Sequence, residues 1–291
     1  MDGVLIIDKP AGMTSHDVVN RVRKILKTKK VGHTGTLDPF ATGVLVMLVG
    51  KATRLAQFVD KAAKEYVAEI RFGFATDTGD LTGTPIGNEE TPQLSRAAIE
   101  RVLPKFRGEI EQVPPMYSAK KVGGKKLYEL ARKGETVERK PFLAKVHELQ
   151  LLSSGEKTIR ILVACSAGTY IRTLAEDIGK ELGTGAHLTS LRRTAAGQFD
   201  LNEAIALEGL ERSETPSDAL LPIEHLISHL PKFELSLERI ETTRNGLSTR
   251  VDRDGLQDHE TVAMLAPDGS IIAIGYFDAA ERRVKPKIVL V

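Results

Sequence analysis

The spacing of apolar residues changes near the C-terminal end of the chain, and this change constrains the fold more than any other feature. Up to about residue 228, apolar runs with strand character alternate with segments of helical periodicity. After Leu230-Pro231, short apolar runs are separated by turn pairs such as Asn245-Gly246 and Asp268-Gly269, a pattern typical of an all-β unit. A chain of 291 residues is long enough for one large domain and a small one. We therefore expect domains at residues 1–228 and 229–291.

Local patterns predict the main elements of the larger domain. A short apolar run closed by a turn predicts a first strand, and Thr14 or Ser15 can cap the helix that follows. Gly183 stands where a second helix should end. Apolar and β-branched residues predict three further strands that share a sheet. The expected strands cover residues 4–7, 66–74, 146–152 and 158–164, and the expected helices cover residues 15–26 and 170–182.

The charges of the chain are strongly clustered, although its net charge is only +2. Six basic and no acidic residues lie between Asp17 and Asp38, on the first helix and the loop after it. Residues 113–142 carry eight basic and three acidic side chains, a net charge of +5, with two tyrosines interleaved. A single block of this kind is most often a solvated surface, but two blocks with tyrosines favour a polyanion such as nucleic acid. We interpret residues 113–142 and the Asp-, Gly- and Thr-rich residues 76–92 as functional loops.

The cysteine count and the apolar runs exclude several classes of protein. The single cysteine, Cys165, cannot form an internal disulfide or a thiolate zinc cluster, and its place at the end of an apolar strand favours a buried thiol. A thiol-dependent hydrolase that uses Cys165 with a histidine stays open. The most apolar run, Gly43–Gly50, is far shorter than the roughly 20 residues that span a bilayer, and no basic segment precedes an apolar one at the N-terminus. We expect a cytoplasmic protein without membrane contact.

Residues 76–80 offer a further choice between a metal site and a turn. The stretch Thr-Asp-Thr-Gly-Asp contains residue types found in calcium loops, but it lacks the alternating ligands and the terminal glutamate of such loops. Turns in which an aspartate bonds nearby backbone explain this composition better. We therefore expect no metal site.

The most unusual stretch is Gly32–Leu45, which places a carboxylate on a loop. Three glycines and Pro39 fix an irregular backbone between the basic helix and an apolar strand, so that Asp38 is presented by a rigid loop. Asp-Pro alone is often only a turn. The neighbouring His33 and the positive charges favour a second interpretation, in which Asp38 acts on a base flipped out of a bound RNA.

Six ordered motifs resemble the bacterial tRNA pseudouridine-55 synthases, the TruB family, and the resemblance covers nearly the whole chain. The final 63 residues are also similar, more weakly, to the PUA-like β-barrel that ends many of these enzymes. The motifs are Gly3–His16 (GVLIIDKPAGMTSH), Gly32–Leu45 (GHTGTLDPFATGVL), Lys64–Tyr66 (KEY), Pro114–Leu130 (PPMYSAKKVGGKKLYEL), Gly168–Leu174 (GTYIRTL) and Gly185–Arg193 (GAHLTSLRR).

The resemblance implies an α+β pseudouridine synthase fold, in which a mixed, largely antiparallel sheet carries flanking helices and RNA-binding loops, followed by the small barrel. It also implies isomerisation of uridine 55 in the TΨC loop of tRNA. This reaction breaks the bond between C1′ and N1 of uracil and rejoins C1′ to C5, so that no atoms are gained or lost and no cofactor is required. The implied partner is the T-arm of tRNA, gripped by residues 113–142, with no obligate protein partner.

The resemblance also assigns roles to individual residues. Asp38 matches the essential aspartate, which either adds covalently or removes a ribose proton to give a glycal intermediate. Arg172 matches the arginine that pairs with it, and this guanidinium is expected to lower the pKa of the carboxyl. Tyr66 matches the tyrosine that stacks on the target base, and His33 the histidine that fills the space left by the flipped nucleotide. The remaining candidates in the site or on the RNA-binding surface are Lys9, Tyr170, Leu191, Lys120, Lys121, Lys125 and Lys126.

One alternative is a non-catalytic protein that binds tRNA or assists its folding. Such a chaperone would need the basic surface but not Asp38. Replacement of Asp38 by asparagine separates the two hypotheses, because only the enzyme would lose its activity.

Overall fold

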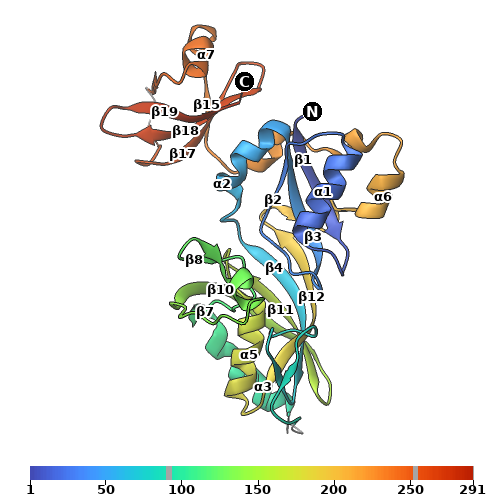
Figure 1. Ribbon diagram of the computed structural model, residues 1–291. Helices are drawn as coiled ribbons and strands as arrows, with labels where there is room; N and C mark the ends of the chain where they lie inside the picture. The colour runs from blue at the N-terminus through green and yellow to red at the C-terminus, as the bar shows by residue number, and fades with distance from the viewer. Residues whose placement is uncertain (90–93, 252–254, 291) are drawn as a thin grey trace.

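The computed structural model describes residues 1–89, 94–251 and 255–290, and a ten-stranded mixed sheet forms the body of the molecule (Figure 1). Its strands, in spatial order, are β14 (Ile205–Ala206), β1 (Gly3–Lys9), β3 (Thr42–Val49), β12 (Ala186–Ala196), β4 (Lys64–Phe72), β11 (Thr158–Cys165), β10 (Phe142–Ser154) and β7 (Gly108–Gln112), with β2 (Val31–Thr34) beside β3 and β13 (Phe199–Asp200) beside β12. Two short hairpins lie outside this sheet, namely β5 (Ala75–Thr76) with β6 (Pro85–Ile86) and β8 (Lys121–Val122) with β9 (Lys125–Lys126).

Helices cover parts of both faces of the sheet. They are α1 (Ser15–Ile25), α2 (Ala56–Val59), α3 (Arg96–Val102), α4 (Leu127–Ala131), α5 (Ile171–Glu181), α6 (Leu207–Arg212) and α7 (Leu237–Arg244), with short 3₁₀ helices η1 (Gly50–Leu55), η2 (Leu103–Phe106), η3 (Pro216–Ala219) and η4 (Ile223–Ile227).

The N-terminal helix forms as its sequence predicts. Thr14 caps α1 by accepting a hydrogen bond from the backbone N–H of Asp17, and the carboxylate of Asp17 in turn accepts one from the backbone N–H of Thr14. The valines of the helix face β1 and β3 and are buried, while its basic side chains lie on the outer face. The first basic block therefore lies at the surface, as expected from the charge pattern.

The centre of the sheet is also the centre of the larger core. Strands β4, β11 and β10 are antiparallel neighbours, which confirms the prediction that these three segments share a sheet. Helix α5 buries Ile171, Leu174, Ala175 and Ile178 against them. It ends before Gly183, whose φ of +75° is a left-handed conformation that glycine adopts at low cost.

The loop that carries Asp38 leads directly into β3, where Gly43 meets β12. This glycine has a φ of +100°, and a Cβ at this position would lie 2.1 Å from the carbonyl oxygen of Arg193. Only glycine allows the two backbones to approach this closely. The contact fixes the start of β3 and hence the position of the loop.

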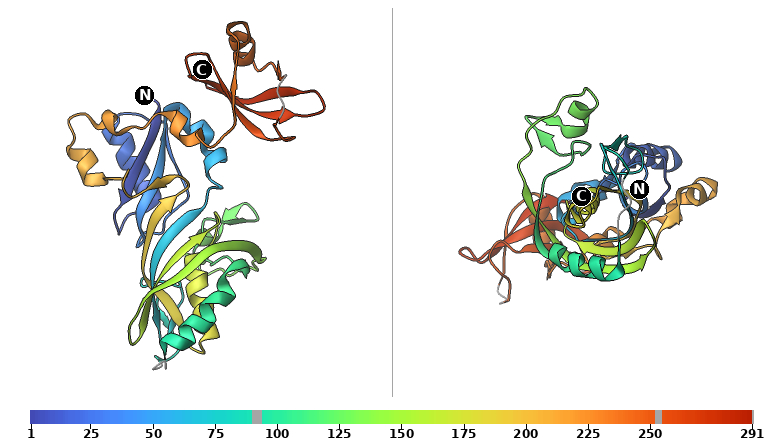
Figure 2. Two further views of the ribbon diagram at one scale, coloured as in Figure 1. Left: turned by 180° about the vertical axis from the view of Figure 1, so that it is seen from behind. Right: turned by 90° about the horizontal axis from the view of Figure 1, so that it is seen from below.

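A second sheet follows the ten-stranded one and curls at the far end of the molecule from α3 and α5 (Figure 2). It consists of β15 (Lys232–Glu234), β17 (Thr261–Leu265), β18 (Ile271–Asp278), β19 (Arg283–Val289) and β16 (Thr249–Arg250). Ala263, Ile274 and Ile288 from this sheet share a core cluster with Val4 and Val46 of the larger one. The expected α+β fold with a small C-terminal β unit is confirmed.

The predicted loops carry short elements of their own. Residues 113–142 contain the β8–β9 hairpin and α4, and this insertion stands clear of the body in the view from below (Figure 2). Of the segment 76–92, residues 90–92 lie outside the described residues, and the rest forms the β5–β6 hairpin. In the described part of the chain, no helix is both long and apolar enough to cross a membrane.

Candidate active site

A cavity of about 240 Å³ lies where the Asp38 loop, β4, β12, the start of α5 and the 113–142 insertion meet. Its walls combine apolar side chains with several charged ones. The lining residues that bear on the chemistry are Asp38, Asp60, Lys64, Tyr66, Ser118, Tyr170, Arg172, Leu191 and Arg193. The structure thus brings Asp38, Tyr66, Tyr170, Arg172 and Leu191, five of the predicted site residues, to one cavity.

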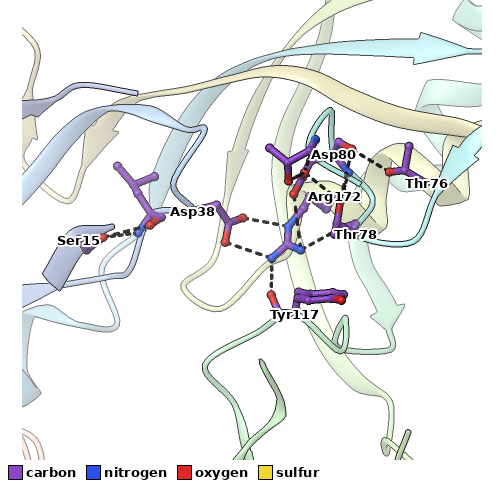
Figure 3. A network of polar contacts seen from close by, with 9 residues as sticks. Ser15, Asp38, Thr76, Thr78, Asp80, Tyr117 and Arg172 are labelled. Atoms are coloured by element: carbon purple, nitrogen blue, oxygen red, sulfur yellow. Dashed lines mark hydrogen bonds and ion pairs between the residues drawn. The ribbon is translucent and has the colours of Figure 1, made fainter. Parts of the chain in front are cut away.

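An ion pair between Asp38 and Arg172 forms the centre of this site (Figure 3). The Nε of Arg172 lies 2.9 Å from Oδ2 of Asp38, and its Nη2 donates to Oδ1 at 3.1 Å. Two parallel bonds of this kind fix both the position and the orientation of a carboxylate. The loop itself is held by Ser15, whose hydroxyl bonds the backbone N–H and carbonyl of Leu37.

The remaining donors of Arg172 hold two other loops (Figure 3). Nη1 donates to the carbonyl of Thr78 at 2.9 Å, and Nη2 donates to the carbonyl of Tyr117 at 2.7 Å. The carboxylate of Asp80 lies 3.9 Å from Nη1 and accepts bonds from the backbone N–H and hydroxyl of Thr82. One buried guanidinium therefore joins the Asp38 loop, the β5–β6 hairpin and the 113–142 insertion.

The pKa of Asp38 departs from the expectation drawn from its sequence. Burial raises the pKa of this carboxyl above its ordinary value of 3.8, the charge of Arg172 opposes the rise, and Asp80 adds to it. The guanidinium acts in the direction that we expected, but its effect is outweighed by desolvation. The sequence therefore predicted the effect of Arg172 correctly but not the net direction of the pKa shift, because it does not show that the folded chain desolvates Asp38.

Lys9 holds the Asp38 loop through hydrogen bonds to its backbone. It is fully buried, and its ammonium donates to the carbonyls of Pro10, Pro39 and Ala41 at 2.8, 3.2 and 2.7 Å. Two of these bonds hold the backbone directly after Asp38, and the third holds the turn that follows Lys9 itself. Burial lowers the pKa of Lys9 to about 8, with Asp38 acting in the opposite direction.

Three side chains shape the walls of the cavity. Tyr66 and Leu191 lie on the adjacent strands β4 and β12, and burial raises the pKa of the Tyr66 hydroxyl. Tyr170 caps α5, where its backbone N–H and carbonyl both bond the side chain of Gln112, and its ring packs edge-on against Phe142. Both tyrosines therefore have fixed positions beside Asp38.

His33 and the four lysines do not line this cavity. His33 lies on β2, where its Nδ1 is buried without a hydrogen-bond partner and burial lowers its pKa. The lysines belong to the projecting insertion, in which Lys120 lies over the ring of Phe142 and Lys126 over that of Tyr128. Ser118 and Ala119 extend the insertion to the cavity wall, so that the basic hairpin and the site are continuous.

Two cations of the cavity wall were quoted in the motifs but given no role. Arg193 is 1% exposed, and Lys64 is 6% exposed. Arg193 could have been found from its spacing, because it follows Leu191 by two residues and a strand places both side chains on one face. The predicted turn at residues 76–80 is confirmed by the bonds that Asp80 accepts, but its closeness to Arg172 carries no sequence signal.

Neither a thiol nor a metal offers a second catalytic centre in the described residues. Cys165 is fully buried, and burial raises its pKa to about 11, which makes it a poor nucleophile. No group of three or more metal-binding side chains occurs in the ranges that the structure describes. A larger cavity of about 430 Å³, between α2 and η4, has no carboxylate among its lining residues, so we place the active site in the smaller one.

Comparison with known proteins agrees with these features. A family model described as TruB family pseudouridylate synthase (N terminal domain) matches residues 23–171, and one described as tRNA pseudouridylate synthase B C-terminal domain matches residues 172–228. The curated tRNA pseudouridine synthase B of Geobacillus thermodenitrificans is 46% identical over 284 residues, which cover 94% of each chain. That of Bacillus subtilis is 42% identical over 302 residues, which cover 100% of this chain and 98% of the relative.

A solved structure gives the same result for the fold. A chain in the structure of an H/ACA RNP bound to a substrate RNA containing 2′-deoxyuridine is 28% identical, with a TM-score of 0.77. The match covers 99% of the chain described here and 85% of the other. The similarity therefore includes the C-terminal sheet as well as the larger one.

Proposed function

Because the chain belongs to the TruB family and is a tRNA pseudouridine synthase, we propose that its target is uridine 55 in the TΨC loop and that Asp38 performs the chemistry. The observation that carries the proposal is the two-bonded Asp38–Arg172 pair in a cavity walled by Tyr66 and Leu191. A carboxylate held in this way can reach a base only if the nucleotide leaves the helical stack, as enzymes that act on bases require.

The residues around Asp38 have distinct roles in this proposal. Asp38 attacks the sugar or removes a ribose proton, and either route begins with the ionised carboxylate. Arg172 keeps that carboxylate charged and oriented, because its guanidinium opposes the effect of burial on the pKa. Tyr66 stacks on the uracil, a contact worth about 1–3 kcal/mol per base. His33 fills the space of the flipped nucleotide, and Lys9 holds the loop.

The basic insertion is proposed to bind the T-arm. Its eight basic side chains suit a phosphate backbone, and the carbonyl of Tyr117 connects it to Arg172. We propose residues 1–228 as the catalytic domain and 229–291 as a PUA-like domain. The start of the second sheet at Lys232 and the end of the matched family model at residue 228 support this boundary. We also propose that the protein acts in the cytoplasm, where it would modify tRNA.

The position of the target is tested with T-arm transcripts labelled with tritium at C5 of uridine, since isomerisation must displace this hydrogen. We expect release from the parent transcript and none when uridine 55 is replaced by cytidine. A transcript with a uridine replaced elsewhere in the loop serves as the matched control and should react normally. Equal release from the transcript without uridine 55 would contradict the proposed position, although not the enzyme class.

A further inference from the structure

Arg193 is a buried cation whose contacts are all neutral. Its Nε donates to the carbonyl of Val44 at 2.6 Å, and its Nη2 donates to the carbonyl of Gly35 at 3.0 Å. Its other side-chain contact is with the hydroxyl of Tyr66. Among the described residues, no carboxylate forms an ion pair with Arg193, although the side chain is 1% exposed.

Lys64 lies on the same wall and shares this property. Its ammonium donates to the carbonyls of Asp60 and Ala62 at 2.7 and 2.6 Å, and no carboxylate of the described chain lies within ion-pair distance of it. Burial lowers the pKa of Lys64 to about 8, the charge of Arg193 adds to the shift, and the more distant carboxylate of Asp60 opposes it. The two cations therefore repel each other, and because both side chains are buried, solvent screens this repulsion only weakly.

The strand register puts these cations beside the proposed base-binding side chains. Tyr66 on β4 is directly opposite Arg193 on β12. Lys64 precedes Tyr66 by two residues and Leu191 precedes Arg193 by two residues, so that each pair lies on one face of its strand. All four side chains line the cavity that contains Asp38. A base held by Tyr66 and Leu191 would thus lie against two positive charges.

A buried charge without a counter-charge is costly, and proteins retain such charges where a ligand supplies the opposite one. Arg172 shows the contrast, because it pairs with Asp38 and lies near Asp80. The cavity wall formed by Arg193 and Lys64 therefore carries two positive charges against the one carboxylate of Asp60, which lines the same cavity but forms no ion pair with either cation.

The reaction supplies a matching negative charge on either route. If Asp38 adds to C1′, a carbon–oxygen bond forms as the C1′–N1 bond breaks, and the electron pair of that bond leaves with the uracil. If Asp38 instead removes the C2′ proton, the C–H pair forms the C1′–C2′ double bond, and the C1′–N1 pair again leaves with the base. In both cases the detached uracil carries one negative charge, shared among its nitrogens and oxygens.

We propose that Arg193 and Lys64 form an anion site that stabilises the detached uracil until its C5 bonds to C1′. Preorganised cations directed at developing charge lower a barrier because they need no reorganisation during the reaction. The proposal rests on the function assigned above, but it holds for both routes open to Asp38.

The test compares how uridine and 5-fluorouridine at position 55 of a T-arm RNA respond to removal of the cation. Fluorine makes the uracil a more stable anion, so that its departure depends less on the protein. For Arg193→Met, we expect the single-turnover loss of uridine to slow by roughly 10²- to 10³-fold, with a much smaller factor for 5-fluorouridine. RNA affinity should stay within a few-fold of the wild-type value, because Arg193 does not lie on the RNA-binding surface.

Arg192 provides a matched control from the same strand. Its guanidinium is bonded to Asp8 at 2.7 and 3.1 Å, and Asp8 and Arg192 do not line the cavity. Arg192→Met should slow both substrates equally or not at all. Lys64→Met tests the second cation and carries the experiment if Arg193→Met does not fold, while Arg193→Lys should recover part of the rate.

Equal slowing of the two substrates by folded Arg193→Met and Lys64→Met would overturn the anion site, because a merely structural defect affects both alike. Unchanged rates in these variants would overturn it too. If the wild type converts neither nucleoside at position 55, the proposed target fails instead, and the comparison is repeated at the uridine that the wild type does convert.

Discussion

Breaking the Asp38–Arg172 pair in a double-mutant cycle is expected to give a coupling energy of about 2–3 kcal/mol. Each of the two charge-assisted bonds is worth about 1.5–3 kcal/mol when its partner is removed. The side chain of Arg172 is 5% exposed, but that of Asp38 is 31% exposed, and solvent screening lowers the sum to this value. The cycle comprises Arg172→Met, Asp38→Ala and the double variant. The bonds to the carbonyls of Thr78 and Tyr117 are lost whenever Arg172 is replaced, so they cancel.

The Asp8–Arg192 pair is the matched control for this cycle. It has two bonds of 2.7 and 3.1 Å, but its side chains are 32% and 39% exposed. Its coupling should therefore stay below about 1 kcal/mol. The free energy of unfolding is measured for all variants by urea denaturation at pH 7 and linear extrapolation. A coupling for Asp38–Arg172 no larger than that of the control would refute the argument that burial strengthens the Asp38–Arg172 pair.

Three further predictions concern other parts of the chain. The folded state releases the protons of Lys9 and Lys64 near pH 8, whereas the unfolded chain keeps them to about pH 10.5, so the free energy of unfolding should rise with pH in this window. Urea titrations at pH 8 and 9.5 should show a gain of roughly 1–2 kcal/mol per lysine, which Lys9→Met and Lys64→Met each reduce; a flat profile would argue against the lowered pKa values. Replacement of the four insertion lysines by alanine should weaken T-arm binding. The slope of log Kd against log salt concentration should fall by about 0.7–0.9 for each phosphate that is no longer neutralised. An unchanged slope would mean that the RNA binds elsewhere on the protein. These lysines are Lys120, Lys121, Lys125 and Lys126. Alkylating reagents should leave the activity intact because the Cys165 thiol is buried and protonated, and rapid inactivation would revive the thiol hypothesis.

Local patterns predicted those elements in which the apolar residues repeat with the spacing of a helix or of a strand. The helix at residues 15–25 and the strand at 158–165 have this property, and both occur as predicted. Strand β12 was not predicted, because Arg192 and Arg193 interrupt its apolar residues. Their side chains belong to opposite faces, one paired with Asp8 and the other buried beside the cavity. A strand that supplies charged residues to a site loses the pattern by which strands are recognised.

The composition of the site could be predicted only in part from local sequence. Asp38 stood out because of its glycine-rich loop, but Arg172 is 134 residues away and joins it only in the folded chain. The resemblance to a family supplied that partner, and the structure adds Asp80, Lys64 and Arg193. No local rule indicates that these cations lack a carboxylate partner, since that property depends on three segments meeting at one cavity.

The central claim is that Asp38 converts the uridine of a bound tRNA. The most direct measurement is single-turnover release of tritium from C5 of uridine 55, with wild type and Asp38→Asn at enzyme concentrations that saturate the RNA. Thermal unfolding and a binding assay establish that the variant is folded and holds the T-arm. The account predicts release by the wild type and none by the variant. Release by a folded, RNA-bound Asp38→Asn at a rate near that of the wild type would contradict it.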